Sequence, residues 1–84
     1  MTISLRPITK DNWWPVARLK VTDAQRNFVA DNTYSLLQAH YEPEYKLTPL
    51  GIYEDETPVG FVMYGQYVYE GQPWWAIWRL MIDV

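Results

Sequence analysis

The stretch WWAIWRLMIDV, residues 74–84, is the most apolar and most strand-like run in this chain of 84 residues. Strict strand alternation predicts one face made by Trp74, Ala76, Trp78, Leu80 and Ile82, and a second face made by Trp75, Ile77, Arg79, Met81 and Asp83. Because both faces are largely apolar, the pattern predicts a buried strand whose tryptophans pack in the core.

Two further strands precede this run and are joined to it by short turns. The segment PVGFVMYG (58–65) is apolar on both faces, which predicts a layer on each side of it. The segment LGIYE (50–54) comes before it across a polar turn, and a second turn lies at residues 70–73. Connections this short predict an antiparallel meander, in which the acidic turn 54–56 is solvated and has no function.

The N-terminal part changes from strand to helix. Residues 3–8 alternate and contain Pro7, which predicts a short strand near a sheet edge. Residues 9–21 then predict a short helix with Asp11 or Asn12 as cap and Pro15 in the first turn. Its apolar stripe comprises Trp13, Val16, Ala17 and Leu19.

A second helix is expected over residues 23–41. Thr22 and Gln25 match a capping box, and Pro43 marks the end of the helix. The residues expected to face the core are Phe28, Leu36 and Leu37. The order is therefore strand, helix, helix, strand, strand, strand, which predicts a single α+β domain.

Composition narrows the classes of function. The net charge is −3 and the pI is near 4.9, which argues against the basic surface of a nucleic-acid binder. No cysteine is present, so disulfides and thiolate zinc sites are excluded, and no other metal site is expected. The sequence shows no leader peptide or membrane span, and we expect a soluble, cytoplasmic protein.

The pair of acids after the second helix is the main candidate binding site. Glu42 and Glu44 alternate with Tyr41 and Tyr45, and carboxylates beside aromatic faces suit a cationic ligand. The alternative is that both acids are solvated residues of a helix end, and the residues alone leave this open. His40, the only histidine, is expected at the surface.

Arg79 lies among apolar neighbours in the closing run and needs a partner. We expect a structural ion pair with Asp83, which lies further along the same predicted face.

Four segments carry a resemblance to a known family. They are ISLRPIT (3–9), VADNTYSLLQAHYEPE (29–44), TPVGFVMYG (57–65) and IWRLMID (77–83). Together with the element order, they resemble the N-terminal half of the GNAT superfamily of acyl-CoA-dependent N-acetyltransferases. The resemblance extends over essentially the whole chain and is closest to bacterial spermidine and diamine acetyltransferases.

The resemblance implies a function and a set of site residues. The backbone of Leu80, Met81 and Ile82 would bind the pantetheine arm of acetyl-CoA, with one amide polarising the thioester carbonyl. The side chains of Tyr41, Glu42 and Glu44 would bind a small-molecule amine, such as the polyamine spermidine. Many relatives carry a glutamate on the fourth strand, where this chain has residues 77–79 (IWR), so the catalytic acid and base stay unassigned.

Two elements of the family lie outside the 84 residues. One is the glycine-rich loop that binds the cofactor pyrophosphate, and the other is the later helix with a proton-donating tyrosine. We therefore expect a truncated domain that is inactive alone. The alternative is a non-catalytic interaction module, a homodimer or strand-paired assembly formed through the closing strand.

Overall fold

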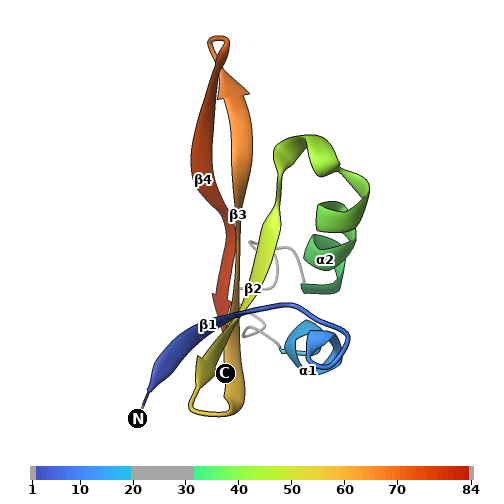
Figure 1. The fold of residues 1–84 in the computed structure, drawn as a ribbon, viewed down its shortest axis with the longest axis vertical. Helices are drawn as coiled ribbons and strands as arrows, with labels where there is room; N and C mark the ends of the chain where they lie inside the picture. Colours follow the sequence, from blue (N-terminus) through green and yellow to red (C-terminus); the bar gives the residue numbers. More distant parts are fainter. Residues whose placement is uncertain (1, 20–31, 84) are drawn as a thin grey trace.

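The structure is a computed structural model, and it describes residues 2–19 and 32–83. The elements in chain order are β1 (Ile3–Pro7), α1 (Trp13–Ala17), α2 (Asn32–Tyr41), η1 (Pro43–Tyr45), β2 (Thr48–Glu54), β3 (Thr57–Tyr69) and β4 (Gln72–Ile82). The predicted element order and mixed α+β class are confirmed, with one added 3₁₀ turn (Figure 1). The predicted capping box at Thr22 and Gln25, and Phe28, lie outside the described residues.

The four strands form one antiparallel sheet in the order β1-β2-β3-β4. The meander is confirmed, and so is the position of β1 at a sheet edge. Both hairpins turn through two residues. Glu70 and Gly71 have φ values of 51° and 77°, the left-handed conformation that a tight hairpin turn needs at both central positions.

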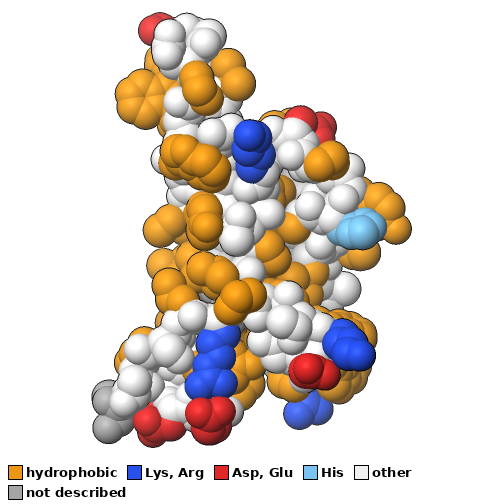
Figure 2. All heavy atoms as spheres, viewed as in Figure 1, with side chains coloured by type: hydrophobic (Ala, Val, Ile, Leu, Met, Phe, Trp, Pro, Cys, Tyr) orange, Lys and Arg blue, Asp and Glu red, His pale blue; other side chains and the backbone are white. Residues whose placement is uncertain are grey.

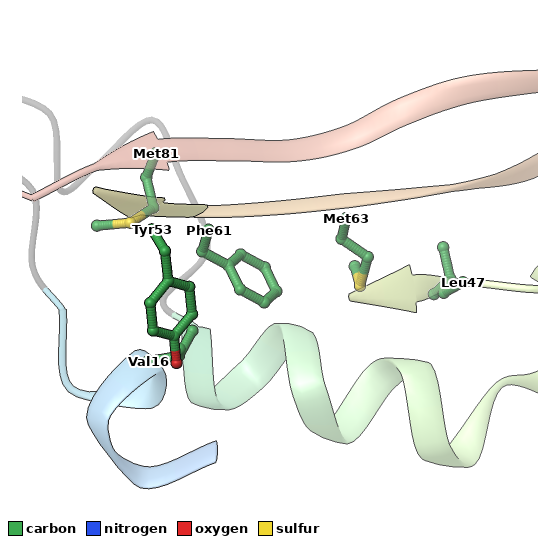
Figure 3. Packing of buried hydrophobic residues seen from close by; sticks show 6 residues of the cluster. All are labelled: Val16, Leu47, Tyr53, Phe61, Met63 and Met81. Carbon is green, nitrogen blue, oxygen red and sulfur yellow. The ribbon is translucent and has the colours of Figure 1, made fainter. Parts of the chain in front are cut away.

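The hydrophobic core lies between the sheet and the two helices, which cover the same face of the sheet (Figure 1). Val16 of α1 belongs to a cluster of buried side chains that come from three strands and from the segment before β2 (Figure 3). These side chains are Leu47, Tyr53, Phe61, Met63 and Met81. Val16, Phe61 and Met63 have no exposed surface, so the centre of the sheet is tightly enclosed on this side.

α1 differs from its predicted cap and stripe. Asn12 occupies the N-cap position, but its Oδ1 accepts from the Thr9 backbone N–H (2.7 Å) and its Nδ2 donates to the Pro7 carbonyl (3.0 Å). The side chain therefore fixes the loop from β1 instead of capping the helix. Trp13 is exposed, which contradicts its assignment to the buried stripe, because a helix of five residues presents only a narrow buried face, centred on Val16.

α2 ends at Tyr41 and is followed by Pro43, as predicted. Leu36 packs against the core, but Leu37 is 54% exposed, which contradicts its predicted core position. The helix instead buries Asn32 and Ser35. The Asn32 amide donates to the Val16 carbonyl (2.8 Å), so a buried hydrogen bond joins the two helices.

Within the described residues, the sheet face turned away from the helices, here termed the far face, lacks the second layer that was expected. Within the described residues, both helices lie on the other face, and far-face side chains such as Leu5, Leu80 and Ile82 remain exposed. Val62 is nevertheless buried, because its direct neighbours on this face are Leu50 and Leu80. Lateral contacts between strands therefore shield β3 without a second layer.

Truncation of a core side chain tests this packing. We expect Phe61→Ala to lower the free energy of unfolding by about 3–5 kcal/mol, because Phe61 is fully enclosed. The matched truncation Leu37→Ala, on the exposed side of α2, should cost less than about 1 kcal/mol. Urea unfolding followed by circular dichroism measures both, and equal losses would contradict the assigned core.

A polar clamp fixes the edge strand to the β2–β3 turn. The Arg6 guanidinium donates to both carboxylate oxygens of Glu56 (each 3.1 Å) and to the Asp55 carbonyl (2.8 Å). It also lies 4.3 Å from the centre of the Tyr53 ring, within range of a cation–π contact. The hydrogen bond from Arg6 holds the pKa of the exposed Glu56 carboxyl below its usual range.

This clamp predicts a pH dependence of stability. Because the folded-state pKa of Glu56 is depressed, its contribution is present above the ordinary value of 4.5 and is lost as pH falls through the folded value. Wild type should melt above Glu56→Gln at pH 7, and the difference should vanish in acid. Thermal melts from pH 7 to pH 3 test this, with Glu54→Gln as the control, which should keep the wild-type profile.

Candidate functional site

The site centres on an irregularity in β4. The β3–β4 register shifts between Met63 and Tyr64, because Met63 pairs with Arg79 while Tyr64 pairs with Ile77. Trp78 is therefore an extra residue in β4, a β-bulge, which interrupts the alternation of faces. Residues 75, 77, 80 and 82 lie on the far face, whereas 78, 79 and 81 face the helices.

This arrangement corrects two predictions for the closing strand. Arg79 does not pair with Asp83: its Nη2 donates to Gln38 Oε1 in α2 (2.9 Å) and its Nη1 donates to the Trp78 carbonyl (3.0 Å). Four residues of extended strand span about 13 Å, so the helix partner is nearer. Trp78 packs against the core as predicted, but Trp74 and Trp75 are more than half exposed.

Gln38 connects Arg79 to a predicted ligand residue. Its amide oxygen accepts from Arg79, and its amide nitrogen donates to Glu42 Oε2 (2.9 Å). The half-buried Glu42 carboxylate is therefore held in place beside the bulge through a single amide. This relay orients the carboxylate, and it leaves Glu42 Oε1 without a partner in the described part of the chain.

Tyr45 completes the contact between η1 and β4. Its ring lies 4.9 Å from the Trp78 ring at 46°, a tilted aromatic pair. The chain approaches β3 closely here: a Cβ on Gly65 would lie 2.8 Å from the Tyr45 carbonyl and 2.6 Å from Leu47 Cδ2. Because Gly65 has no side chain, η1 can pack closely against the sheet at this position.

The other predicted ligand residues are exposed. Tyr41 is 73% exposed and packs edge-on against His40, which lies at the surface as expected. Glu44 is also exposed, on η1. The structure thus connects Glu42 and Tyr45 to β4. Tyr41 and Glu44 are exposed, and these two residues are here termed the rim.

The three predicted cofactor residues lie just after the bulge. Leu80 and Ile82 are exposed on the far face, while Met81 is buried and its Sδ accepts a long hydrogen bond from the Asn32 amide (3.7 Å). Their inner edge is paired with β3, and this pairing continues to Asp83, whose N–H donates to the Val59 carbonyl (2.8 Å). Within the described residues no strand pairs with their outer edge.

Two buried donors mark the centre of the cluster. Trp78 Nε1 and Arg79 Nε are inaccessible to solvent, and neither has a hydrogen-bond partner among the described residues. An unpaired buried donor costs about 1–3 kcal/mol, so these two groups lower the stability of the fold. The cluster therefore combines a held carboxylate, an aromatic pair and two unsatisfied donors.

The residues that organise this cluster were missed at the sequence level. Gln38 lies four positions before Glu42 on the helix, a spacing that permits a side-chain pair and could have identified it. The inward position of Trp78 depends on the bulge, and the sequence carries no glycine or other local signal for it.

Comparisons with known proteins supply no relative. No family model, no curated protein and no solved structure matches the chain. Residues 2–19 and 32–83 contain no group of three His, Asp or Glu side chains placed to hold a metal ion. None of the helices described has the length and apolar character needed to cross a membrane.

The relay through Gln38 can be tested by an apolar replacement. Gln38→Leu keeps the approximate volume but leaves Arg79 without its acceptor and Glu42 without its donor. We expect a loss of about 1–3 kcal/mol in the free energy of unfolding, measured in urea. Gln66→Leu in β3 is the control, because the side chain of Gln66 makes no hydrogen bond to the described residues; an equal loss there would contradict the relay.

Proposed function

We propose that this chain is the acceptor-binding half of an acetyl-CoA-dependent N-acetyltransferase. The acceptor is a primary amine, with a polyamine such as spermidine as the expected class. The observation that carries the proposal is the meeting of the Glu42–Tyr45 segment with the bulge of β4, directly beside an unpaired strand edge. An amine site and a backbone site for an extended cofactor arm then lie next to each other.

The open edge supports the cofactor part of the proposal. An unpaired strand edge presents alternating N–H and C=O groups, which complement the amide groups of a pantetheine arm. Leu80–Ile82 offer such an edge, and the buried Met81 side chain anchors it to the core. Acetyl-CoA would contribute the thioester that is cleaved, and the chain would contribute the binding surface.

The position of Glu42 supports the acceptor part. Its carboxylate is half-buried and held by Gln38, so an ammonium group could pair with its second oxygen without reorganising the site. Tyr41 and Glu44 would contact the rest of a long polyamine at the rim. The Arg79 guanidinium donates to the amide oxygen of Gln38.

The chemistry would be a direct transfer of the acetyl group. The neutral amine nitrogen forms a bond to the thioester carbonyl carbon, the carbon–sulfur bond breaks, and the thiolate leaves and is protonated. The ammonium must first lose a proton to water or to a nearby acid. Positions 77–79 supply no carboxylate, so a proton path through water is part of the proposal.

A non-catalytic interaction module is the second candidate function. The observation that favours it is the same unpaired edge of β4, along which no described strand pairs. Both functions are compatible with one fold, because β4 is 11 residues long and the cofactor would use only its last three.

Separate binding measurements test the enzymatic proposal without requiring turnover. Amide spectra of ¹⁵N-labelled protein should shift at Leu80–Ile82 with acetyl-CoA, and at Glu42 and Tyr45 with spermidine. Absence of any shift at Leu80–Ile82 with acetyl-CoA would count against the proposal.

Removal of one carboxylate should weaken amine binding. We expect Glu42→Gln to raise the Kd for spermidine about fivefold or more, the equivalent of an ion pair of about 1 kcal/mol. Glu44→Gln, at the rim, should have a smaller effect. The control is Glu54→Gln, which makes the same charge change in the distant β2–β3 hairpin; isothermal titration at low salt compares all three.

A further inference from the structure

The β3–β4 hairpin extends well beyond the rest of the sheet (Figure 1). The pairing of β2 with β3 stops at Thr48–Tyr64, while β3 and β4 remain paired to Tyr69–Gln72. Residues 66–75, here termed the aromatic arm, therefore form a two-stranded ribbon within the described residues. An isolated two-stranded ribbon is at best marginally stable in water.

The aromatic arm exposes large side chains on both of its faces. Trp75 is 61% exposed and Val68 is 74% exposed, and the remaining exposed members are Tyr67, Tyr69 and Trp74. Figure 2 shows hydrophobic side chains gathered along this projecting part of the molecule. The only charge in residues 66–75 is that of Glu70, at the turn, so the arm lacks the charges that normally protect such surfaces.

The outer edge of β4 offers a defined window for pairing. Pro73 lacks an N–H and marks one limit, and the bulge at Trp78 marks the other. Between them Trp74–Ile77 form a regular strand segment that carries no charge. Ile77, the last residue of this window, is 64% exposed.

We propose that a second copy of this chain docks on the window Trp74–Ile77, so that two aromatic arms pair antiparallel about a two-fold axis at Ala76. Residues that pair directly across a ladder lie on one face. This register places Trp75 of each copy beside Ile77 of the other, both on the far face. The proposal rests on the second candidate function and does not depend on acetyl transfer.

A two-fold partner fits the window better than an unrelated one. An edge placed against itself by a two-fold axis is antiparallel by symmetry, and the uncharged window brings no like charges together. An anionic membrane is disfavoured, because the arm has no Lys or Arg and the chain has a net charge of −3.

The chain exposes 6106 Å², against about 5,200 Å² for a compact monomer of its mass of 10.0 kDa. It therefore carries more exposed surface than a compact monomer of this size. The radius of gyration of 13.2 Å likewise exceeds the approximately 11.8 Å of a compact domain of this length.

Crosslinking tests the register directly, because the chain contains no cysteine. Ala76→Cys should form a disulfide-linked dimer on mild oxidation, since each Ala76 would lie opposite its copy. Ile82→Cys is the matched control on the same strand, and it should crosslink far more slowly because it lies far from the axis. Equal crosslinking of the two variants would overturn the register and the proposal.

Light scattering after size exclusion tests the association itself. Wild type should dimerise with rising concentration, and Trp75→Lys should raise the dimer Kd about tenfold or more. Trp14→Lys is the control, because Trp14 is 57% exposed on α1 and outside the window. A wild type that stays monomeric, or a dimer unaffected by Trp75→Lys, overturns the proposal, as does flotation of monomer with neutral phosphatidylcholine vesicles.

These results are separable from those of the enzymatic proposal. Dimerisation is read from mass and crosslinking, whereas acetyl-CoA binding is read from amide shifts at Leu80–Ile82. Either proposal can therefore fail while the other stands.

Discussion

The extra residue in β4 determines how the rest of the domain is arranged. Because Trp78 has no direct partner in β3, the side chains of Trp78 and Arg79 both face the helices, and those of Ile77 and Leu80 lie on the opposite face. Without this shift Trp78 would lie on the face opposite to Arg79 and could not contact Tyr45. The bulge therefore links the sheet to the end of α2.

The same link explains why the core is small yet well defined. Five strand and loop side chains and Val16 fill the space under the helices, and Asn32 joins both helices to the core edge through Val16 and Met81. The Arg6–Glu56 clamp holds the edge strand β1 against the β2–β3 turn. The packing is held at two separated points, as a domain with a limited core requires.

Local signals allowed much of the fold to be predicted. The turn residues Asp55, Glu56, Glu70 and Gly71, and the proline after α2, correctly placed the hairpins and the helix end. The direction in which each side chain points, toward the core or toward solvent, was predicted less well, because it depends on contacts between residues far apart in the sequence. Leu37 was assigned to the core on hydrophobicity, yet the helix buries Ser35 instead. Arg79 likewise pairs with Gln38 in α2 and not with its expected partner in the same strand.

The candidate site was only partly predictable for the same reason. Glu42 and Tyr45 were singled out by their residue types, but their inward position follows from Gln38, Gly65 and the bulge, which act through space. The assignment of the chain to an acetyltransferase remains a proposal based on resemblance and on this geometry. The structure does make the proposal more specific, since it selects Glu42 as the inner carboxylate and leaves Glu44 at the rim.

The bulge also divides the open edge of β4 into two parts with different capacities. Before it, Trp74–Ile77 belong to a ribbon that only β3 supports, and the exposed aromatic surface favours pairing with another strand. After it, Leu80–Ile82 are anchored by Met81 in the core, which gives a rigid edge suited to a flexible, extended ligand. A bulge interrupts regular pairing, so a partner strand that follows the first part is directed away from the second. Pairing of two copies and binding of a cofactor arm can therefore occur on one strand without competing.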